Sequence, residues 1–166
     1  EVIERGRYWY ECRNGQLQPK GCVNENRQRI EIGQNYVQDE YEVSCQLGGD
    51  GFLKFAHTAC VGPDGARHRA GETWADPSNT YYFECKPDGQ YMRAVVGGCI
   101  QHDKQGRIKI GEKYDQGEYT YECQRKHTGS VQMCSVGCIH EGRRFKIGEQ
   151  WDEGDFVFYC DKREGR

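Results

Sequence analysis

The sequence repeats one cysteine-framed pattern four times. In residues 99–123, a cysteine opens the unit, a glycine and an aromatic residue lie near its middle, and a second cysteine closes it. The aromatic residue follows the glycine by three positions in every copy, at Gly33 and Tyr36, Gly71 and Trp74, Gly111 and Tyr114, and Gly148 and Trp151. Constant spacing of this kind indicates a tandem repeat. We therefore expect the chain to fold as a series of small, similar units.

Each repeat is too small to be held together by a hydrophobic core alone. A unit of roughly 40 residues has a marginal core, and only 36% of the residues are hydrophobic. The 10 cysteines compensate, because a disulfide typically contributes about 2–4 kcal/mol by restricting the unfolded chain. Regularly spaced cysteines in small units are typical of secreted proteins. We therefore expect an oxidised, extracellular protein.

The opening and closing cysteines of the four units are separated by nearly the same number of residues. This regularity predicts equivalent disulfides, Cys22–Cys45, Cys60–Cys85, Cys99–Cys123 and Cys138–Cys160. Cys12 and Cys134 are left over. The sequence leaves two arrangements open for them: they bond to each other, or Cys12 bonds to a partner chain.

The repeat also predicts where the units begin and end. Residues 8–12 (YWYEC) copy residues 119–123 (YTYEC), the closing strand of a unit whose opening half is absent. The predicted domains are an N-terminal half-unit at 1–21 and full units at 22–59, 60–98, 99–137 and 138–166. The half-unit is either a natural cap or the remainder of a trimmed unit, and the absence of a signal peptide favours a mature or trimmed chain.

The hydrophobic pattern within each unit has the period of β-strands. Ile108 and Ile110 alternate with charged residues, and Tyr119, Tyr121 and Cys123 share one face of the next strand. The repeated glycine ends the first run, where we expect it to supply a backbone angle that other residues resist. No helix signal or flexible linker is present. The predicted fold is all-β, a tandem of small, disulfide-stapled antiparallel modules with short joints.

Composition and motifs narrow the function. The net charge of −3 gives no electrostatic footprint for nucleic acid, and no segment approaches the roughly 18 apolar residues of a membrane span. His57 and Cys60 are three residues apart, but Cys60 opens a repeat, so a disulfide is favoured over a zinc site. No nucleophile elbow, His-Glu-x-x-His motif or phosphate-binding loop occurs. We expect a protein that is not an enzyme and has no metal or cofactor.

The centre of the repeat resembles the fibronectin type I module. Residues 110–114 (IGEKY) and 147–151 (IGEQW) match the centre of that family's pattern, and an aromatic-x-Cys strand follows each. The resemblance covers about residues 22–166 and implies small all-β modules. The family normally has four cysteines per module, whereas each unit here has two. Cys134 lies near the position of the family's last cysteine, so the resemblance also implies a rival bond, Cys123–Cys134.

The two-cysteine form resembles the fibronectin type I-like repeats of the nematode abnormal-cell-migration family. Residues 98–100 and 137–139, both GCI, carry that signature. The resemblance implies a secreted protein of the extracellular matrix or basement membrane that supports cell migration together with a secreted ADAM-family metalloprotease. Its implied partners are a matrix component or another extracellular protein, and the metalloprotease.

A binding module of this kind would contact its partner through exposed side chains near a joint between units. We expect partner-binding residues at Tyr91, Met92 and Arg93, because tyrosine and arginine are enriched at interface hot spots. The alternative for Tyr91 is a core ring of the joint. Trp9 is a further candidate, because its neighbours in the alternation face the core. An interface needs about 800 Å² from each partner, so we expect two adjacent units to bind and a single unit not to suffice.

Two further functions remain open. A basic residue recurs before the repeated glycine, and it forms either a solvated strand face, the favoured interpretation, or a stripe for an anionic glycan. The glycan candidates are Arg107, Arg143, Arg144 and Lys146. A function of another class, a secreted protease inhibitor or receptor-binding effector, would use the rigid turns Gly48–Gly51 and Lys126–Ser130.

Overall fold

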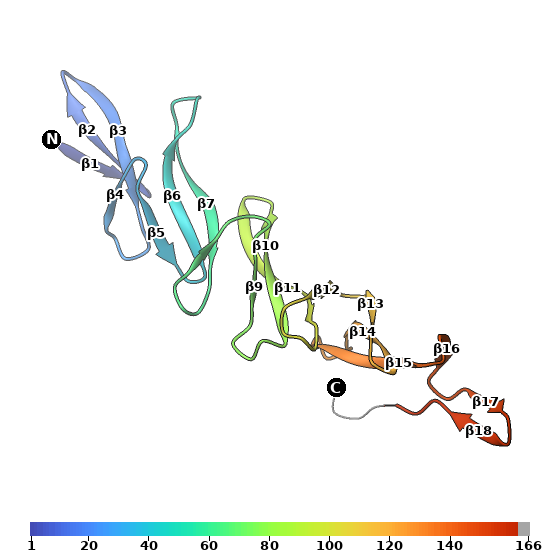
Figure 1. Cartoon of the computed structure of the whole chain (residues 1–166). Helices are drawn as coiled ribbons and strands as arrows, with labels where there is room; N and C mark the ends of the chain where they lie inside the picture. Colours follow the sequence, from blue (N-terminus) through green and yellow to red (C-terminus); the bar gives the residue numbers. More distant parts are fainter. Residues whose placement is uncertain (163–166) are drawn as a thin grey trace. The chain divides into compact units, whose positions relative to one another are not determined.

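The computed structural model describes residues 1–162. Within that range the secondary structure comprises 18 strands and no helix, which confirms the predicted all-β class (Figure 1). The strands are β1 (Val2–Arg5), β2 (Tyr8–Arg13), β3 (Gln16–Val23), β4 (Arg29–Glu31), β5 (Asn35–Gln38), β6 (Tyr41–Leu47), β7 (Leu53–Val61), β8 (Arg67–His68), β9 (Thr73–Ala75), β10 (Tyr81–Asp88), β11 (Tyr91–Ile100), β12 (Arg107–Lys109), β13 (Lys113–Gln116), β14 (Tyr119–Arg125), β15 (Val131–His140), β16 (Arg143–Lys146), β17 (Gln150–Glu153) and β18 (Phe156–Tyr159).

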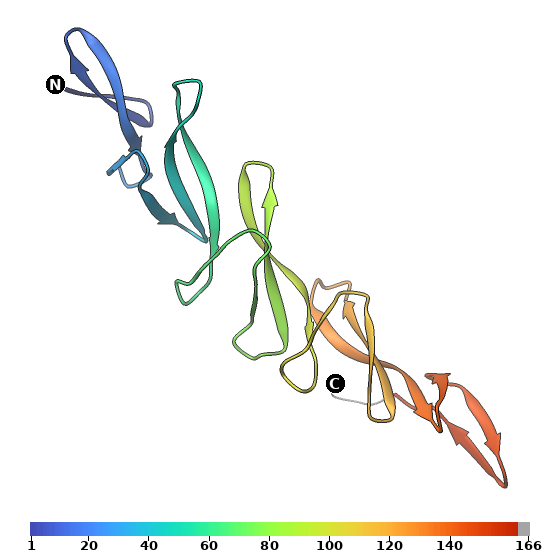
Figure 2. The same cartoon turned by 45° about the horizontal axis from the view of Figure 1, so that its top comes forward.

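The described strands form five small sheets. Four sheets have the orders β1-β2-β3-β4, β5-β6-β7-β8, β12-β11-β10-β9 and β13-β14-β15-β16, and the fifth is the hairpin β17-β18. Neighbours in a sheet are consecutive in sequence, and the two central strands of each four-stranded sheet form its long hairpin (Figure 2). The pairs are antiparallel, as between β6 and β7 and between β14 and β15.

The repeated glycine closes the turn between successive sheets. Its φ is 90° at Gly33, 88° at Gly71, 93° at Gly111 and 93° at Gly148, a backbone region that residues with a Cβ resist. In each copy its N–H donates a hydrogen bond of 2.7 or 2.8 Å to the carbonyl oxygen of the closing cysteine. This geometry confirms the role expected of the glycine and ties the turn to the disulfide.

Four disulfides join consecutive sheets, in the pairs that the cysteine spacing predicts: Cys22–Cys45, Cys60–Cys85, Cys99–Cys123 and Cys138–Cys160. Each opening cysteine lies on the third strand, in chain order, of one sheet. The closing cysteine lies on the second strand of the next sheet, or directly after it in the case of Cys160. The cysteine-to-cysteine units are thus offset from the sheets. Strand β4, for example, lies within the predicted unit 22–59 but pairs with β3 of the first sheet.

The buried cores form around these bonds. One core consists of Cys22, Cys45 and Leu53, with partly buried hydrophobic residues such as Tyr8 and Phe55 packed against it. An equivalent core consists of Cys99, Ile108 and Cys123, with Tyr114, Val131 and Met133 packed around it. The chain divides into two compact units, residues 1–72 with 85–95 and residues 73–84 with those from 96 onward. Each of the two cores lies within one of these units.

The residue before each opening cysteine is small because another strand passes close to it. This residue is Gly21, Ala59, Gly98 and Gly137 in the four units. A Cβ added at Gly98 would lie 2.0 Å from the carbonyl oxygen of Ile108 and 2.8 Å from the ring of Tyr82. Close approach of the backbone therefore explains the glycine in the GCI signature.

Cys12 and Cys134 are not bonded to each other or to another cysteine in the described part of the chain. The rival bond Cys123–Cys134 is wrong for a geometric reason. Cys123 lies opposite Met133 in the register of β14 and β15, and successive side chains on a strand point to opposite faces. Cys134 therefore projects away from Cys123. Cys12 has the backbone position of a closing cysteine, because its N–H donates to the Glu1 carbonyl at 2.8 Å as that of Cys45 does to Gln34 at 3.1 Å.

Candidate partner-binding pocket

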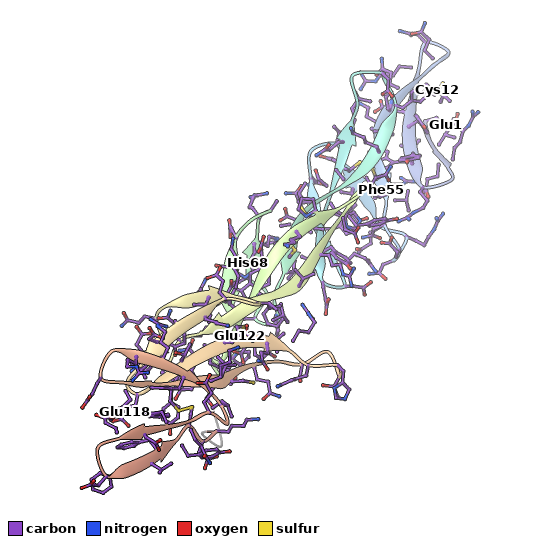
Figure 3. The ribbon with its side chains drawn as sticks, turned by 90° about the vertical axis from the view of Figure 1, so that its right-hand side faces the viewer. Glu1, Cys12, Phe55, His68, Glu118 and Glu122 are labelled. Carbon is purple, nitrogen blue, oxygen red and sulfur yellow. A yellow bond between two sulfur atoms is a disulfide. The ribbon has the colours of Figure 1, made fainter. Side chains whose placement is uncertain are left out.

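A hollow lies in the unit formed by residues 1–72 and 85–95. Its volume is about 470 Å³, within the range of small-ligand and side-chain pockets. The lining side chains come from β5, β6, β7 and β11 and from four connecting loops. They include Arg7, Glu25, Tyr36, Tyr41, Phe55, His57 and Tyr91. Phe55 is labelled on its strand in Figure 3. The hollow combines aromatic walls with one ion pair.

Three rings form one wall of this pocket. The His57 ring lies 5.1 Å from the Tyr41 ring and 4.8 Å from the Tyr91 ring, which meets it edge-on. Such tilted and edge-on contacts are favourable arrangements for aromatic groups. Tyr91 nevertheless remains 60% exposed. It therefore has one edge fixed by His57 and most of its surface open to a partner.

The other wall carries charge. The guanidinium carbon of Arg7 lies 4.5 Å above the centre of the Phe55 ring, a cation–π contact. Arg7 also pairs with Glu25, with 2.6 Å between Nη2 and Oε1. Because Arg7 is held by both groups, the pocket presents an oriented ion pair beside an aromatic surface.

His57 carries an unsatisfied polar atom. Its Nδ1 is buried and has no hydrogen-bond partner among residues 1–162. Burial lowers the pKa of His57, although the charge of Glu25 opposes this change. The ring is therefore favoured in its neutral form. A buried polar atom without a partner is costly, and a bound group with a complementary atom would relieve that cost.

The structure separates the three joint residues predicted to bind a partner. Tyr91 lines the pocket, whereas Met92 and Arg93 are not among its lining residues. Arg93 is exposed and lies 3.8 Å from Asp88. The notion of Tyr91 as a buried core ring does not hold, since most of its surface is exposed.

Trp9 does point away from the core, but its ring is not free. Its Nε1 donates a hydrogen bond of 3.2 Å to the carbonyl oxygen of Ile30, and the guanidinium of Arg29 lies 5.7 Å above the ring. A Cβ at Gly21 would come within 2.4 Å of Trp9 Nε1. Trp9 therefore packs over the outer face of its own sheet.

The recurring arginine has an intramolecular partner in every unit. Arg29 pairs with Glu4 at 2.7 Å, Arg67 with Glu42 at 2.5 Å and Arg144 with Asp115 at 2.5 Å, while Arg107 donates to Thr73 and lies over Tyr82. In each case the arginine reaches across its own sheet. This pairing across the sheet explains why the arginine recurs in every unit, and the explanation requires no bound glycan.

Two of the glycan candidates nevertheless meet in one hollow. Arg144 and Lys146 line a cavity of about 270 Å³ together with Lys113 and Glu149. Arg143 lies over the Phe145 ring at 5.2 Å, and neither it nor Arg107 lines this cavity. Glycan binding stays a prediction.

Sequence reasoning missed Arg7, Glu25 and His57 as pocket residues. They are far apart in the sequence, and only strand pairing brings them together. One signal was present in the sequence: His57 is two residues after Phe55, and the period of two of a strand places both side chains on one face. A histidine at a core-facing strand position therefore indicated a polar site.

Among residues 1–162, no helix is long and apolar enough to cross a membrane. One group of side chains in that range has the composition of a metal site: His140, Glu141 and Glu153. It lies in the second compact unit and is separate from the aromatic pocket.

Comparison with known proteins agrees with the architecture. The fibronectin type I domain matches residues 1–53, 58–131 and 136–166. An uncharacterized protein of Caenorhabditis elegans is 52% identical over 144 residues, which cover 87% of this chain and 39% of that protein. A second uncharacterized protein of C. elegans is 24% identical over 149 residues, which cover 80% and 43%. The chain thus spans about two fifths of the length of these curated relatives.

No solved structure matches the chain. The family match, in contrast, extends over nearly all of it and agrees with the all-β sheets, the glycine turns and the four disulfides. The protein therefore belongs to the fibronectin type I domain family.

Proposed function

We propose that this chain is a non-enzymatic, extracellular binding protein whose partner occupies the pocket around Tyr91 and His57. Fibronectin type I repeats are non-catalytic modules, and domains with several disulfides are typical of extracellular proteins. The observation that carries the proposal is Tyr91, which is 60% exposed and lies against His57 in an aromatic hollow. Interface hot spots are enriched in such tyrosines.

The pocket specifies the chemistry of its occupant. Its rings suit an apolar or aromatic side chain, and the Arg7–Glu25 pair suits a polar group beside it. Strand β5 is an edge strand of its sheet and contributes Tyr36 to the lining. An extended protein segment could therefore pair with that edge while placing one side chain in the pocket.

The partner we favour is a component of the basement membrane. The GCI signature and the two-cysteine repeat support this choice through their likeness to the nematode abnormal-cell-migration repeats. In that role the protein would support cell migration and basement-membrane remodelling alongside a secreted ADAM-family metalloprotease. The relatives in C. elegans are compatible with a nematode-type protein.

Binding to immobilised basement-membrane extract tests the proposal. Tyr91→Ala should weaken binding by about 30-fold or more, because a hot-spot truncation costs about 2 kcal/mol or more. Tyr159→Ala is the matched control, since Tyr159 is 55% exposed and lies outside the pocket. Equal binding by both variants and the parent chain, with all three folded, would remove the pocket from the proposal.

Protease inhibition is the second candidate, and one observation favours it. Phe52 is 73% exposed and directly follows the turn Gly48–Gly51, in which Phe52 N–H donates to Asp50 at 3.0 Å. The turn is thus a braced loop that presents an aromatic side chain. A panel of metalloprotease and serine-protease assays distinguishes the candidates: an inhibitor would slow one protease, and Phe52→Ala would abolish the effect while Tyr91→Ala would not.

A further inference from the structure

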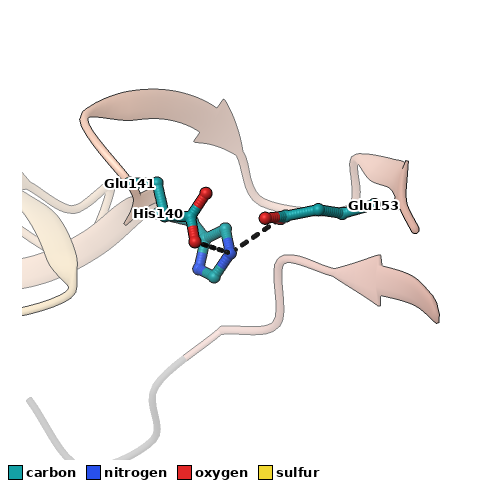
Figure 4. A group of neighbouring side chains, drawn as sticks. All are labelled: His140, Glu141 and Glu153. Carbon is teal, nitrogen blue, oxygen red and sulfur yellow. Dashed lines mark ion pairs between the residues drawn. The ribbon is translucent and has the colours of Figure 1, made fainter. Parts of the chain in front are cut away.

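The second compact unit contains a cluster of three ligand-bearing side chains. His140 ends β15, Glu141 follows it in the turn to β16, and Glu153 ends β17. Their nearest ligand atoms lie within 4.8 Å of one another. Figure 4 shows the two carboxylates approaching the same ring nitrogen, with His140 Nε2 2.8 Å from Glu153 Oε2 and 4.0 Å from Glu141 Oε1.

The neighbouring structure fixes the orientation of these groups. The His140 ring lies 4.9 Å from the Phe158 ring and 5.9 Å from the Trp151 ring. Glu141 has a φ of 50°, an uncommon conformation for a residue with a Cβ. That conformation holds Glu141 in the tight turn beside His140. The ligands therefore come from a ring held between two aromatic side chains in tilted contacts, a tight turn and a paired strand.

The charges of the cluster are not balanced. Two carboxylates face one imidazole, and a single imidazole can offset at most one negative charge. Like charges at short range are unfavourable, and a divalent cation would remove the conflict. The side chains of His140 and Glu153 are 35% and 38% exposed, so an ion can reach them from solvent.

We propose that His140, Glu141 and Glu153 bind one Zn²⁺ ion, with water in the remaining position. One imidazole and two carboxylates are ligand types that zinc accepts in tetrahedral sites. Two ligands about 2.0–2.1 Å from a tetrahedral zinc lie about 3.3 Å from each other. The His140–Glu153 separation of 2.8 Å would therefore open slightly, and the His140–Glu141 separation of 4.0 Å would close slightly. Small side-chain rotations are sufficient.

The site would join two sheets. His140 belongs to the sheet β13–β16, whereas Glu153 belongs to the hairpin β17–β18. The other units have Asn24, Gly62 and Gln101 two residues after their opening cysteines, where this unit has His140. The ion would thus be specific to the last described unit, whose final sheet has two strands only. It would hold this short hairpin to the preceding sheet.

Zinc titration by calorimetry, with thermal unfolding measured in parallel, tests the site. We use the oxidised chain carrying Cys12→Ser and Cys134→Ser, because both cysteines are unbonded and a free thiol also binds zinc. One equivalent of zinc should bind, and free zinc at about 100 times Kd should raise Tm by more than about 5 °C relative to the metal-free chain. The ¹⁵N resonance of His140 Nε2 should shift on binding.

Variants separate coordination from a simple ion pair. His140→Ala and Glu153→Gln should each lower the zinc affinity by at least about 10-fold, whereas His127→Ala and Glu112→Gln, which change residues outside the cluster, should bind as the parent chain does. Each Tm shift is compared with the metal-free Tm of the same variant, so loss of the ion pair alone does not count. Lack of stoichiometric binding, or binding that survives both His140→Ala and Glu153→Gln, would overturn the proposal. The result is independent of binding at Tyr91.

Discussion

At the scale of single residues, the repeat is maintained by positions that accept only a narrow range of residues. The position before an opening cysteine is one of them, because it holds glycine in three units and alanine in the fourth. Where the residue is glycine, the lack of a Cβ allows a neighbouring carbonyl to approach, as that of Ile108 does at Gly98. Small residues at this position let the long hairpin of one sheet lie against its fourth strand.

Gly98→Ala should therefore destabilise the protein. The new Cβ would lie 2.0 Å from a backbone oxygen, which cannot move aside as a flexible side chain can, so the cost should be at least about 1–3 kcal/mol, as for overpacked sites. Urea unfolding of the oxidised chain measures the difference. Gly89→Ala is a useful control, because no atom lies within 4 Å of the added Cβ, although its φ of 63° adds some strain. A smaller loss for Gly98→Ala than for Gly89→Ala would contradict the packing argument.

The pairing of Arg144 with Asp115 across the sheet predicts how the stability of the fold depends on pH. The Thr120 hydroxyl donates to Asp115, and this hydrogen bond together with Arg144 lowers the pKa of Asp115, against the opposing effect of burial. A lowered folded-state pKa means that the contribution to stability is present above the unfolded pKa of about 3.9 and is lost as the pH falls through the folded value. The parent chain should therefore lose more stability below about pH 4 than Asp115→Asn.

The measurement is the free energy of unfolding of both chains at a series of pH values between about 2 and 6. Other carboxylates titrate in both proteins, so the difference between the two curves isolates Asp115. The gap between parent and variant should narrow as the pH falls. A gap that stays constant across this range would show that the Asp115 carboxylate charge does not stabilise the fold.

At the scale of strands and sheets, the sequence predicts the disulfides, the turns and the strands, but it does not predict which strands pair into one sheet. The cysteines, the glycine turn and the alternating aromatic residues are local signals, and all of them have the expected roles. The division into sheets depends on pairing between strands of successive repeats. Strand β4 follows Cys22 in sequence yet pairs with β3 of the first sheet, and no local pattern indicates that choice.

The candidate sites were harder to predict for the same reason. Tyr91 was predicted from its residue type and its position near a joint between units. Arg7 and His57, in contrast, reach the pocket only because the chain folds distant segments together. The His140 cluster was missed because a search for paired histidines overlooks a carboxylate from another strand. A motif with fixed residue spacing identifies ligands that lie on one strand or turn. The aromatic pocket and the His140 cluster each combine residues from several strands and turns.

Removal of one framework disulfide should have its largest effect at the scale of the sheets. Cys123→Ser removes the disulfide that joins β11 to β14. This bond lies in a buried core, so its loss should lower the free energy of unfolding by about 2–5 kcal/mol. We expect the variant to be secreted poorly and to form mixed disulfides through the Cys99 thiol. Secretion yield and melting temperature are the readouts, with Cys12→Ser as the control at an unbonded cysteine. Normal secretion and an unchanged melting temperature would show that the bond is dispensable.

At the scale of the whole molecule, the proposed binding pocket combines residues from several repeats. The aromatic pocket takes Arg7 from the N-terminal half-unit, His57 from the next unit and Tyr91 from the one after that, when units are counted between cysteines. If the partner occupies this pocket, we expect that no single repeat suffices to bind. It also explains how modules of roughly 40 residues can offer enough surface for a specific interface.

The most direct test of this account is photo-crosslinking from position 91. The photoreactive residue benzoylphenylalanine replaces Tyr91 in one chain and the exposed control Tyr159 in another, and each is irradiated while bound to basement-membrane extract. The account predicts one dominant crosslinked partner from position 91, suppressed by an excess of the unmodified chain and little affected by an excess of Tyr91→Ala, and no such product from position 159. The same products from both positions, or none from position 91 while the chain is bound, would contradict it.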